Sequence, residues 1–287
     1  IMQNDRLKNF LLLHLVVFIA GFTAILGELI TIGSASLVWF RMFIAAILMY
    51  IYVKIRGIRL QISKRTLVQF SIAGVIIALH WITFFEAIKQ SNISITLAMF
   101  STGAFFGSFI EPIIYKRKII LYEILLGLLV ILGIYLIVQS EFTHIYGMIL
   151  GICSAFLSSL FAVINGKFVA QHNATVISFY EFISGVVFIS IYLLFINNGF
   201  NASFFKLSGY DWLWLFILAS VCTAFAFIIS VAVMREISPY TVILTYNLEP
   251  IYGFILAVIF FPEKETMSMT FYLGSAIILI TVILNSV

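Results

Sequence analysis

Long uninterrupted runs of apolar residues dominate the chain, and only short polar segments separate them. A run of about 20 apolar residues is what an α-helix needs to cross the hydrocarbon core of a bilayer. Strands of a membrane barrel would alternate apolar and polar residues, whereas the run from Ile119 to Val138 is apolar on every face. The pattern predicts ten membrane-crossing helices, at about 8–30, 36–53, 67–88, 92–115, 119–138, 146–166, 174–196, 211–234, 239–262 and 267–285.

Composition strengthens this prediction and removes several function classes. Of the 287 residues, 63% are apolar and 10% are charged, whereas soluble domains carry about 25% charge. Ten crossings leave no length for a soluble catalytic domain. Cys153 and Cys222 lie inside apolar runs without a metal-ligand spacing, and no nucleotide-binding loop or nucleophile–base pair is present. We therefore expect no metal, no cofactor, no catalytic residues and no enzyme activity.

The basic residues predict how the chain lies in the membrane. Twelve of the 16 lysines and arginines fall on the side that holds the N-terminus, and Lys89, Lys206 and Lys264 fall on the other side. Because cytoplasmic loops are enriched in basic residues, both termini are expected in the cytoplasm, with the protein in a bacterial inner membrane. The formal net charge of +4 is explained by this bias, so no nucleic-acid partner is expected.

The two halves of the chain resemble one another. The segment 22–30 recurs at 159–169, and the segment 87–91 recurs at 232–236. We place the repeats at residues 1–140 (spans one to five) and 141–287 (spans six to ten). Five is an odd number of crossings, so the second repeat is inverted relative to the first. Inverted helical repeats are typical of secondary transporters, which bind substrate near the membrane midplane between the repeats.

Several motifs carry a resemblance to a known family. They are NLEPIYG at 247–253, FPEK at 261–264, IEP at 110–112 and GFTAILG at 21–27. Together with the ten spans, they make the chain resemble the EamA-type branch of the drug/metabolite transporter superfamily, over essentially its whole length. The resemblance implies movement of a metabolite or amino acid by alternating access, with spans one to four and six to nine around the pathway.

Glu249 is the most unusual residue in the chain because of its depth. Span nine begins near Pro239, so a rise of 1.5 Å per residue places Glu249 about 15 Å into the membrane. Pro250 removes a backbone hydrogen bond and predicts a kink there, beside Tyr246 and Asn247. A carboxyl group at this depth suits the alternate binding of a proton or a cationic substrate. An alternative stays open, in which Glu249 remains protonated and only shapes the kink.

Other polar and aromatic residues are candidates for the same pathway. His80 and Glu86 lie on span three, beside Trp81, and we expect them to contribute to substrate or proton binding. Phe225 on span eight is expected to join Trp81 in an aromatic-lined cavity for flat or cationic substrates. Core packing or lipid contact is the alternative role for these aromatic side chains.

Four charged residues suggest a pair of gates. Arg41 lies inside span two and requires a carboxylate partner, for which Glu28 at the outer end of span one and Glu86 on span three are candidates. In the repeat, Glu28 aligns with Lys167 and Arg41 aligns with Glu181, so the signs of the charges are exchanged. We expect Glu28–Arg41 to close the outer mouth and Lys167–Glu181 to close the inner mouth. The alternative is that each pair only neutralises charge beside the headgroups.

The sequence therefore predicts an all-α integral membrane protein that acts as a secondary transporter, with a small-molecule substrate and the lipid bilayer as its partners. We expect an exporter of an amino-acid-like or amphipathic compound, with proton coupling and a homodimer left open. Two alternatives remain. The first is a membrane-embedded lipid-handling protein or enzyme that uses Glu249 and His80 as acid and base, and the second is a passive channel or scramblase.

Overall fold

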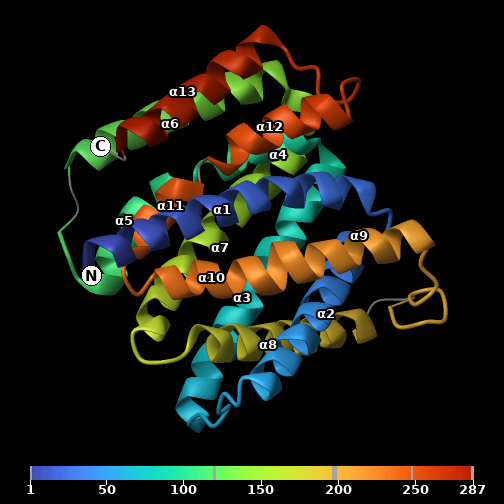
Figure 1. Ribbon diagram of the computed structural model, residues 1–287. Coiled ribbons are helices and arrows are strands. Elements are labelled where there is room, and N and C mark those ends of the chain that lie inside the picture. Colours follow the sequence, from blue (N-terminus) through green and yellow to red (C-terminus); the bar gives the residue numbers. More distant parts are fainter. Residues whose placement is uncertain (1, 119–120, 196–198, 247, 286–287) are drawn as a thin grey trace.

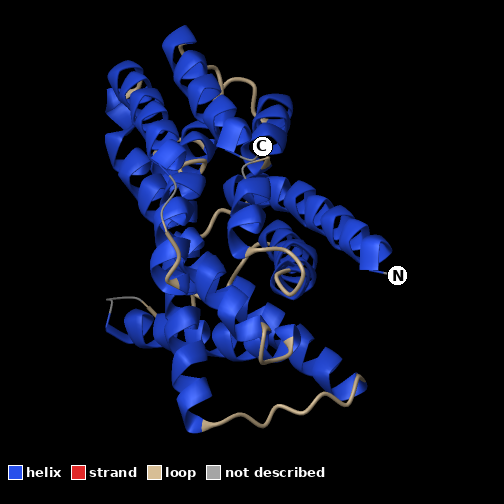
Figure 2. Cartoon of the chain, turned by 90° about the vertical axis from the view of Figure 1, so that its left-hand side faces the viewer, coloured by secondary structure: helices blue, strands red, loops and turns tan. Residues whose placement is uncertain are grey.

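The computed structural model describes residues 2–118, 121–195, 199–246 and 248–285, and every element in these residues is helical (Figures 1 and 2). The unbroken crossings are α1 (Met2–Leu29), α2 (Ser34–Ile55), α3 (Lys64–Gln90), α6 (Leu121–Ser140), α7 (Ile145–Val169), α8 (Ala174–Phe195) and α13 (Met269–Asn285). Three crossings are broken, into α4 (Ile93–Phe100) and α5 (Gly103–Tyr115), into α9 (Gly209–Ala219), the π-helical turn η2 (Ser220–Phe225) and α10 (Ala226–Val233), and into α11 (Pro239–Tyr246) and α12 (Glu249–Phe260). A short 3-10 turn, η1 (Phe142–His144), precedes α7.

The helices have the lengths and the surface of a membrane protein. Eight segments of the described chain are long and apolar enough to cross a bilayer, and the described parts of α6 and α13 add two shorter apolar helices. Large apolar side chains point outward on these helices, such as Leu125 and Leu128 of α6, which are 59% and 58% exposed. Such a surface is stable only against lipid. The expected all-α membrane fold is therefore confirmed.

Two of the breaks occupy corresponding crossings of the two repeats, the fourth and the ninth. Between α4 and α5 there is no proline, and the hydroxyl groups of Ser101 and Thr102 donate to the carbonyls of Leu97 (2.9 Å) and Met99 (2.7 Å). Between α11 and α12 the break lies beside Pro250, in the first turn of α12. Broken helices at matching positions of inverted repeats mark the substrate region in several transporter folds.

The helices of the two halves are interleaved. Helix α3 packs against α7 and α8, α2 packs against α8, and α1 packs against α10 and α12. At Gly74 of α3 the approach is so close that a Cβ atom would lie 2.2 Å from the backbone carbonyl oxygen of Glu181 in α8. Contacts between the halves therefore reach the backbone itself.

Helices α6 and α13 form a separate pair at the edge of the molecule (Figure 1). They cross where two glycines meet, because a Cβ on Gly133 would lie 2.8 Å from the Gly274 oxygen and a Cβ on Gly274 would lie 2.7 Å from the Gly133 oxygen. Small residues of this kind allow membrane helices to pack closely without a hydrophobic driving force. The pair thereby stands outside the bundle that encloses the site.

Carboxylates tie the two halves together at one end of the molecule, where α1 ends and α2 begins. Glu28 accepts a hydrogen bond from Lys264 at 2.7 Å. Asp211 accepts from the backbone nitrogen of Thr31 at 2.8 Å. Glu265 accepts from the first backbone nitrogens of α4, at 3.1 and 2.9 Å. We call this the α1–α2 loop end, and these three links join the two halves there.

Candidate functional site

A cavity lies at the centre of the helix bundle. Its walls come from α1, α2, α3, α7, η2 and α10, and from the broken crossings four and nine. The described parts of α6, α8 and α13 do not contribute to them. The space open to the centres of water molecules is about 100 Å³, whereas one water needs about 10–15 Å³ on that measure. The cavity therefore has room for several waters or for part of a compact solute.

Arg41 is the charged residue of α2 in the cavity wall and is only 2% exposed. Its Nε donates to the Thr223 hydroxyl at 2.6 Å, and its Nη2 donates to the Cys222 carbonyl at 3.3 Å. The guanidinium carbon lies 3.9 Å from the centre of the Trp81 ring. The third nitrogen, Nη1, is buried without any hydrogen-bond partner. The side chain is thus held through two of its nitrogens, and the third has no partner within the described residues.

The π-helical turn η2 explains how a membrane helix can hold this arginine. At the end of η2 the backbone nitrogen of Ala226 donates to the carbonyls of Val221, five residues earlier, and Thr223, instead of to that of Cys222. The Thr223 hydroxyl donates to the Leu218 carbonyl at 2.6 Å, which leaves its lone pairs for the arginine. Such turns inside α-helices frequently occur at functional sites. The widened turn therefore supplies the two acceptors that the buried guanidinium needs.

Glu249 brings a carboxyl group into the same cavity. It is 5% exposed and is the first residue of α12, immediately after the break in crossing nine. The N-terminus of a helix carries a partial positive charge, which favours a carboxylate at this position. Tyr246, the last residue of α11, also lines the cavity and donates to the Ser230 hydroxyl at 3.2 Å. The break in crossing nine thus places the carboxyl group of Glu249 and the phenol of Tyr246 in the cavity wall.

His80 lines the cavity from α3, but its ring is already engaged. Nδ1 lies 2.9 Å from the hydroxyl and 3.0 Å from the carbonyl oxygen of Ser154 in α7. The ring also stacks on Phe100, with the ring centres 5.7 Å apart. His80 is therefore primarily a link between α3 and α7, with one face turned to the site.

The remaining predicted binding residues lie elsewhere. Glu86 accepts hydrogen bonds from Ser34 at 2.7 Å and from Gln90 at 2.8 Å near the end of α3, away from the cavity. Phe225 is 47% exposed and points out of the bundle. Phe227 lines the cavity in its place, because the extra residue of the π-helical turn rotates the helix. Asn247 lies outside the described residues.

Neither predicted charge pair forms. Among the described residues, Glu28 binds Lys264 instead of Arg41, because the segment after α12 folds over the end of α1. Exposed Lys167 donates to the Ile114 carbonyl at 2.6 Å, not to Glu181. The pairings inferred from the repeat were wrong, because each basic side chain found neutral acceptors within reach. A gating role for these residues stays a prediction without its pairs.

Several site residues carried no sequence signal that we used. Thr223 and the Cys222 carbonyl became visible only with the π-helical turn. Ser230, and the Ser158–Ser159 pair of α7, are polar side chains in apolar runs that line the cavity. Within the described residues, no group of three or more histidines, cysteines or acidic residues is placed to hold a metal ion.

Comparison with known proteins agrees with this arrangement. The sequence profile of the EamA-like transporter family matches twice, over residues 7–139 and 145–287. No curated protein matches the chain. Among solved structures, 25 chains match, and one of them, titled "Crystal structure of protein", has a TM-score of 0.70 at 14% identity and covers 96% of each chain. That likeness shows a shared fold.

The family profile covers nearly all of the chain in two copies, which correspond to the two five-span halves. The family consists of membrane transporters, so the alternative of an enzyme built on Glu249 and His80 finds no support at the level of the family. With the broken crossings and the central cavity, these matches identify the chain as a member of the EamA-like transporter family.

Proposed function

We propose that the protein exports a small zwitterionic, amino-acid-like or amphipathic compound through the central cavity by alternating access. The observation that carries the proposal is the unsatisfied Nη1 of Arg41, a residue of the cavity wall that Glu249 also lines. A buried guanidinium nitrogen without a partner is unfavourable, so a carboxylate ligand would stabilise it.

The chemistry of the cavity walls supports this choice of substrate. Arg41 offers a donor to a carboxylate, and Glu249 offers an acceptor to an ammonium group. The surrounding walls are apolar and largely aromatic, with Trp81, Phe100 and Phe227 among them. A compound with two opposite charges and an apolar side group matches all three features.

Alternating access is supported by the form of the two ends. Three carboxylate links join the halves at the α1–α2 loop end. We infer that they close this end, so that substrate enters the cavity from the opposite end in this state. The bias of basic residues supports an orientation with the α1–α2 loop end outside and both termini in the cytoplasm, in a bacterial inner membrane. Export is the direction that the family resemblance suggests.

A binding experiment with matched ligands tests the substrate class. The unfolding temperature of the protein in nanodiscs would be measured with each of three ligands. They are L-leucine, 4-methylpentanoate, which lacks the amine, and 3-methylbutylamine, which lacks the carboxylate. We expect the zwitterion to raise the unfolding temperature most. Arg41→Gln should abolish the effect of the carboxylate, and Glu249→Gln should abolish that of the amine. Lys206→Gln, at an exposed loop position, is the matched control.

A transport experiment tests the mechanism. Proteoliposomes loaded with unlabelled L-amino acids should accumulate an external labelled mixture of amino acids transiently, because a carrier exchanges its substrates. A channel gives no such counterflow and no saturation. The proposed function would be contradicted if the wild-type protein showed no counterflow and all three ligands changed its unfolding temperature equally.

A further inference from the structure

A second polar pair is buried in the bundle, away from the cavity. Glu181 of α8 and Asn165 of α7 are both 0% exposed. Asn165 Nδ2 lies 3.4 Å from Glu181 Oε2, a long hydrogen bond. Glu181 Oε1 and Asn165 Oδ1 are buried with no partner at all. Two of the three oxygens of the pair therefore lack a donor.

We propose that the Glu181–Asn165 pair is the proton-binding site that couples transport to a proton gradient, separate from the substrate cavity. The inference rests on the proposed function, because it assigns the driving ion of that same transport. A proton on the carboxyl group supplies the donor that the pair lacks. The amide can turn its oxygen toward this donor, since amide oxygen and nitrogen occupy equivalent positions.

The surroundings of Glu181 favour a proton over a metal cation. A carboxylate buried without a counter-charge is unfavourable by several kcal/mol. Sodium or another hard cation needs about six oxygen ligands, and the pair offers three oxygens. A proton requires only one acceptor and one hydrogen-bond partner.

The charged and titratable groups on the elements packed against α8 are engaged elsewhere. Arg41 of α2 is held by η2, His80 of α3 by Ser154, and Lys167 of α7 by the Ile114 carbonyl. On α8 itself the Tyr180 hydroxyl donates to the Leu60 carbonyl at 2.7 Å. The other such groups on these elements are exposed or lie near the opposite end of their helices: Tyr50, Tyr52, Lys54, Lys64, Arg65, Glu86, Lys89, Tyr146, Cys153 and Tyr192. Helix α10 carries no titratable side chain.

The internal repeat places Glu181 at the position that corresponds to Arg41 in the first half. Arg41 is the eighth residue of α2, and Glu181 is the eighth residue of α8, its counterpart in the second repeat. Counted from the start of its helix, each lies about 10 Å into the membrane. Because the repeats are inverted, the two residues enter from opposite sides. One repeat thus places a cation beside the cavity, and the other places an acid at the equivalent position.

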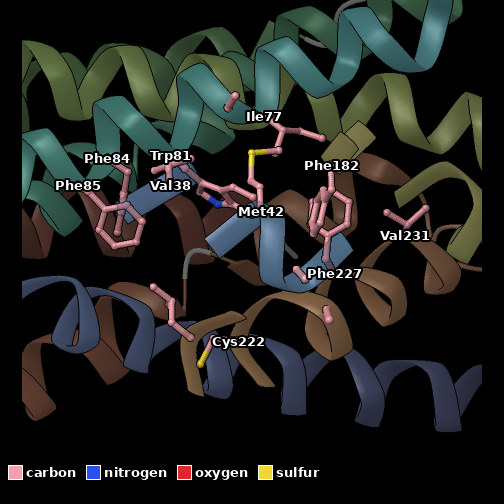
Figure 3. Close-up of a cluster of buried hydrophobic side chains, with 14 of the residues drawn as sticks. Val38, Met42, Ile77, Trp81, Phe84, Phe85, Phe182, Cys222, Phe227 and Val231 are labelled. Atoms are coloured by element: carbon pink, nitrogen blue, oxygen red, sulfur yellow. The ribbon is translucent and has the colours of Figure 1, made fainter. Parts of the chain in front are cut away.

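A continuous set of contacts joins Glu181 to the substrate site. The next residue, Phe182, packs against Trp81 and Phe227, with ring centres 5.4 and 4.9 Å apart (Figure 3). Both partners line the cavity, and Trp81 lies beneath the guanidinium of Arg41. The backbone of Glu181 also contacts Gly74 of α3 directly. Proton binding therefore changes the charge at a contact between the halves that reaches the substrate site through one aromatic ring.

Infrared spectroscopy tests proton binding without any substrate. In difference spectra of the protein in nanodiscs between acid and alkaline pH, a protonated buried carboxyl group gives a carbonyl band that disappears on ionisation. We expect one such band to be lost in Glu181→Gln and to titrate at a different pH in Asn165→Ala. The exposed control Glu236→Gln should leave it unchanged. If folded Glu181→Gln keeps every carboxyl carbonyl band of the wild type, the assignment is overturned.

Transport separates this inference from the proposed function. An imposed pH gradient should accelerate uptake of the labelled amino-acid mixture by wild-type proteoliposomes. In Glu181→Gln this acceleration should be lost while counterflow persists, because the amide imitates the protonated acid. Acceleration that survives in Glu181→Gln, or acceleration by a sodium gradient at equal pH, overturns the proton site. Loss of counterflow in the wild-type protein would instead overturn the proposed function. Glu181→Asp, which keeps the acid, should restore a response to the pH gradient if Glu181→Gln folds poorly.

Discussion

Replacing Arg41 with methionine tests whether this side chain serves binding or stability. Among the described residues no carboxylate lies within 4 Å of Arg41, so its burial is not offset by an ion pair. Replacing a buried ion pair by apolar residues of similar volume is often neutral or stabilising, by about 1–4 kcal/mol, and removing an unpaired buried charge should act in the same direction. Against this, an orphaned Cys222 carbonyl costs about 1–3 kcal/mol. The two effects nearly cancel, and the Thr223 hydroxyl keeps its bond to Leu218.

We therefore expect Arg41→Met to change the free energy of unfolding by less than about 2 kcal/mol. Binding should respond very differently. A hydrogen bond to a charged group contributes about 1.5–3 kcal/mol, so the affinity for a carboxylate ligand should fall about 10- to 150-fold.

Unfolding in mixed micelles measures the free energy of unfolding, and binding of L-leucine in nanodiscs measures the affinity for a carboxylate ligand. Phe182→Ala provides the reference for a structural residue, because removing a buried phenylalanine ring typically costs about 3–5 kcal/mol. If Arg41→Met destabilises the protein as strongly as Phe182→Ala, or binds L-leucine as the wild type does, Arg41 is a structural residue and the reasoning is refuted.

Three further predictions follow from single positions. Phe227→Ala should weaken L-leucine binding, whereas Phe225→Ala, on the outward face of the π-helical turn, should leave it unchanged. Equal effects of the two changes would contradict the rotation of the helix that brings Phe227 to the cavity. Gly74→Ala places a Cβ 2.2 Å from a backbone oxygen of α8, so it should destabilise the protein by about 1–3 kcal/mol, while Gly209→Ala, which meets nothing within 4 Å, should be neutral in the same unfolding assay. The hydrogen bond to Glu28 raises the pKa of Lys264, so the lysine charge that this contact needs is fully present below the ordinary lysine pKa and is lost as pH rises through the raised value. Labelling of a cysteine placed at the α1–α2 loop end should therefore increase at strongly alkaline pH in the wild-type protein and not in Lys264→Gln; the same alkaline increase in both would exclude the contact as its cause.

The crossings were predictable because a membrane helix can be recognised in a sequence from the length of its apolar run. Each of the ten predicted runs corresponds to one helix or one broken helix of the structure. The break beside Pro250 has an evident cause in the sequence, a ring that cannot donate a hydrogen bond. The break at Ser101 and Thr102 has no proline, and it depends on hydroxyl groups that bond back to the preceding turn. Hydroxyl residues in membrane helices do this without always breaking the helix, so the sequence alone does not reveal it.

The site was predictable in its residue types more than in its partners. Glu249, Tyr246, His80 and Trp81 all line the cavity, and Arg41 joins them although we expected it at a gate. The error arose from the assumption that a buried arginine needs a carboxylate. A π-helical turn supplied a hydroxyl and a carbonyl instead. The same turn shifted the inward face from Phe225 to Phe227, which no count at 3.6 residues per turn could anticipate.

The position of Cys222 gives the protein a reporter of its own. Cys222 belongs to the cavity wall beside Arg41, whereas the other cysteine, Cys153, is exposed on the membrane-crossing helix α7. A small charged thiol reagent travels through water and not through lipid, so it should distinguish the two thiols in the native sequence. The rate at which it modifies Cys222 then measures how long the cavity stays open to each side of the membrane, and a bound solute slows that reaction in proportion to its occupancy. The working cycle can thus be timed in unaltered protein, with Cys222→Ser as the silent reference.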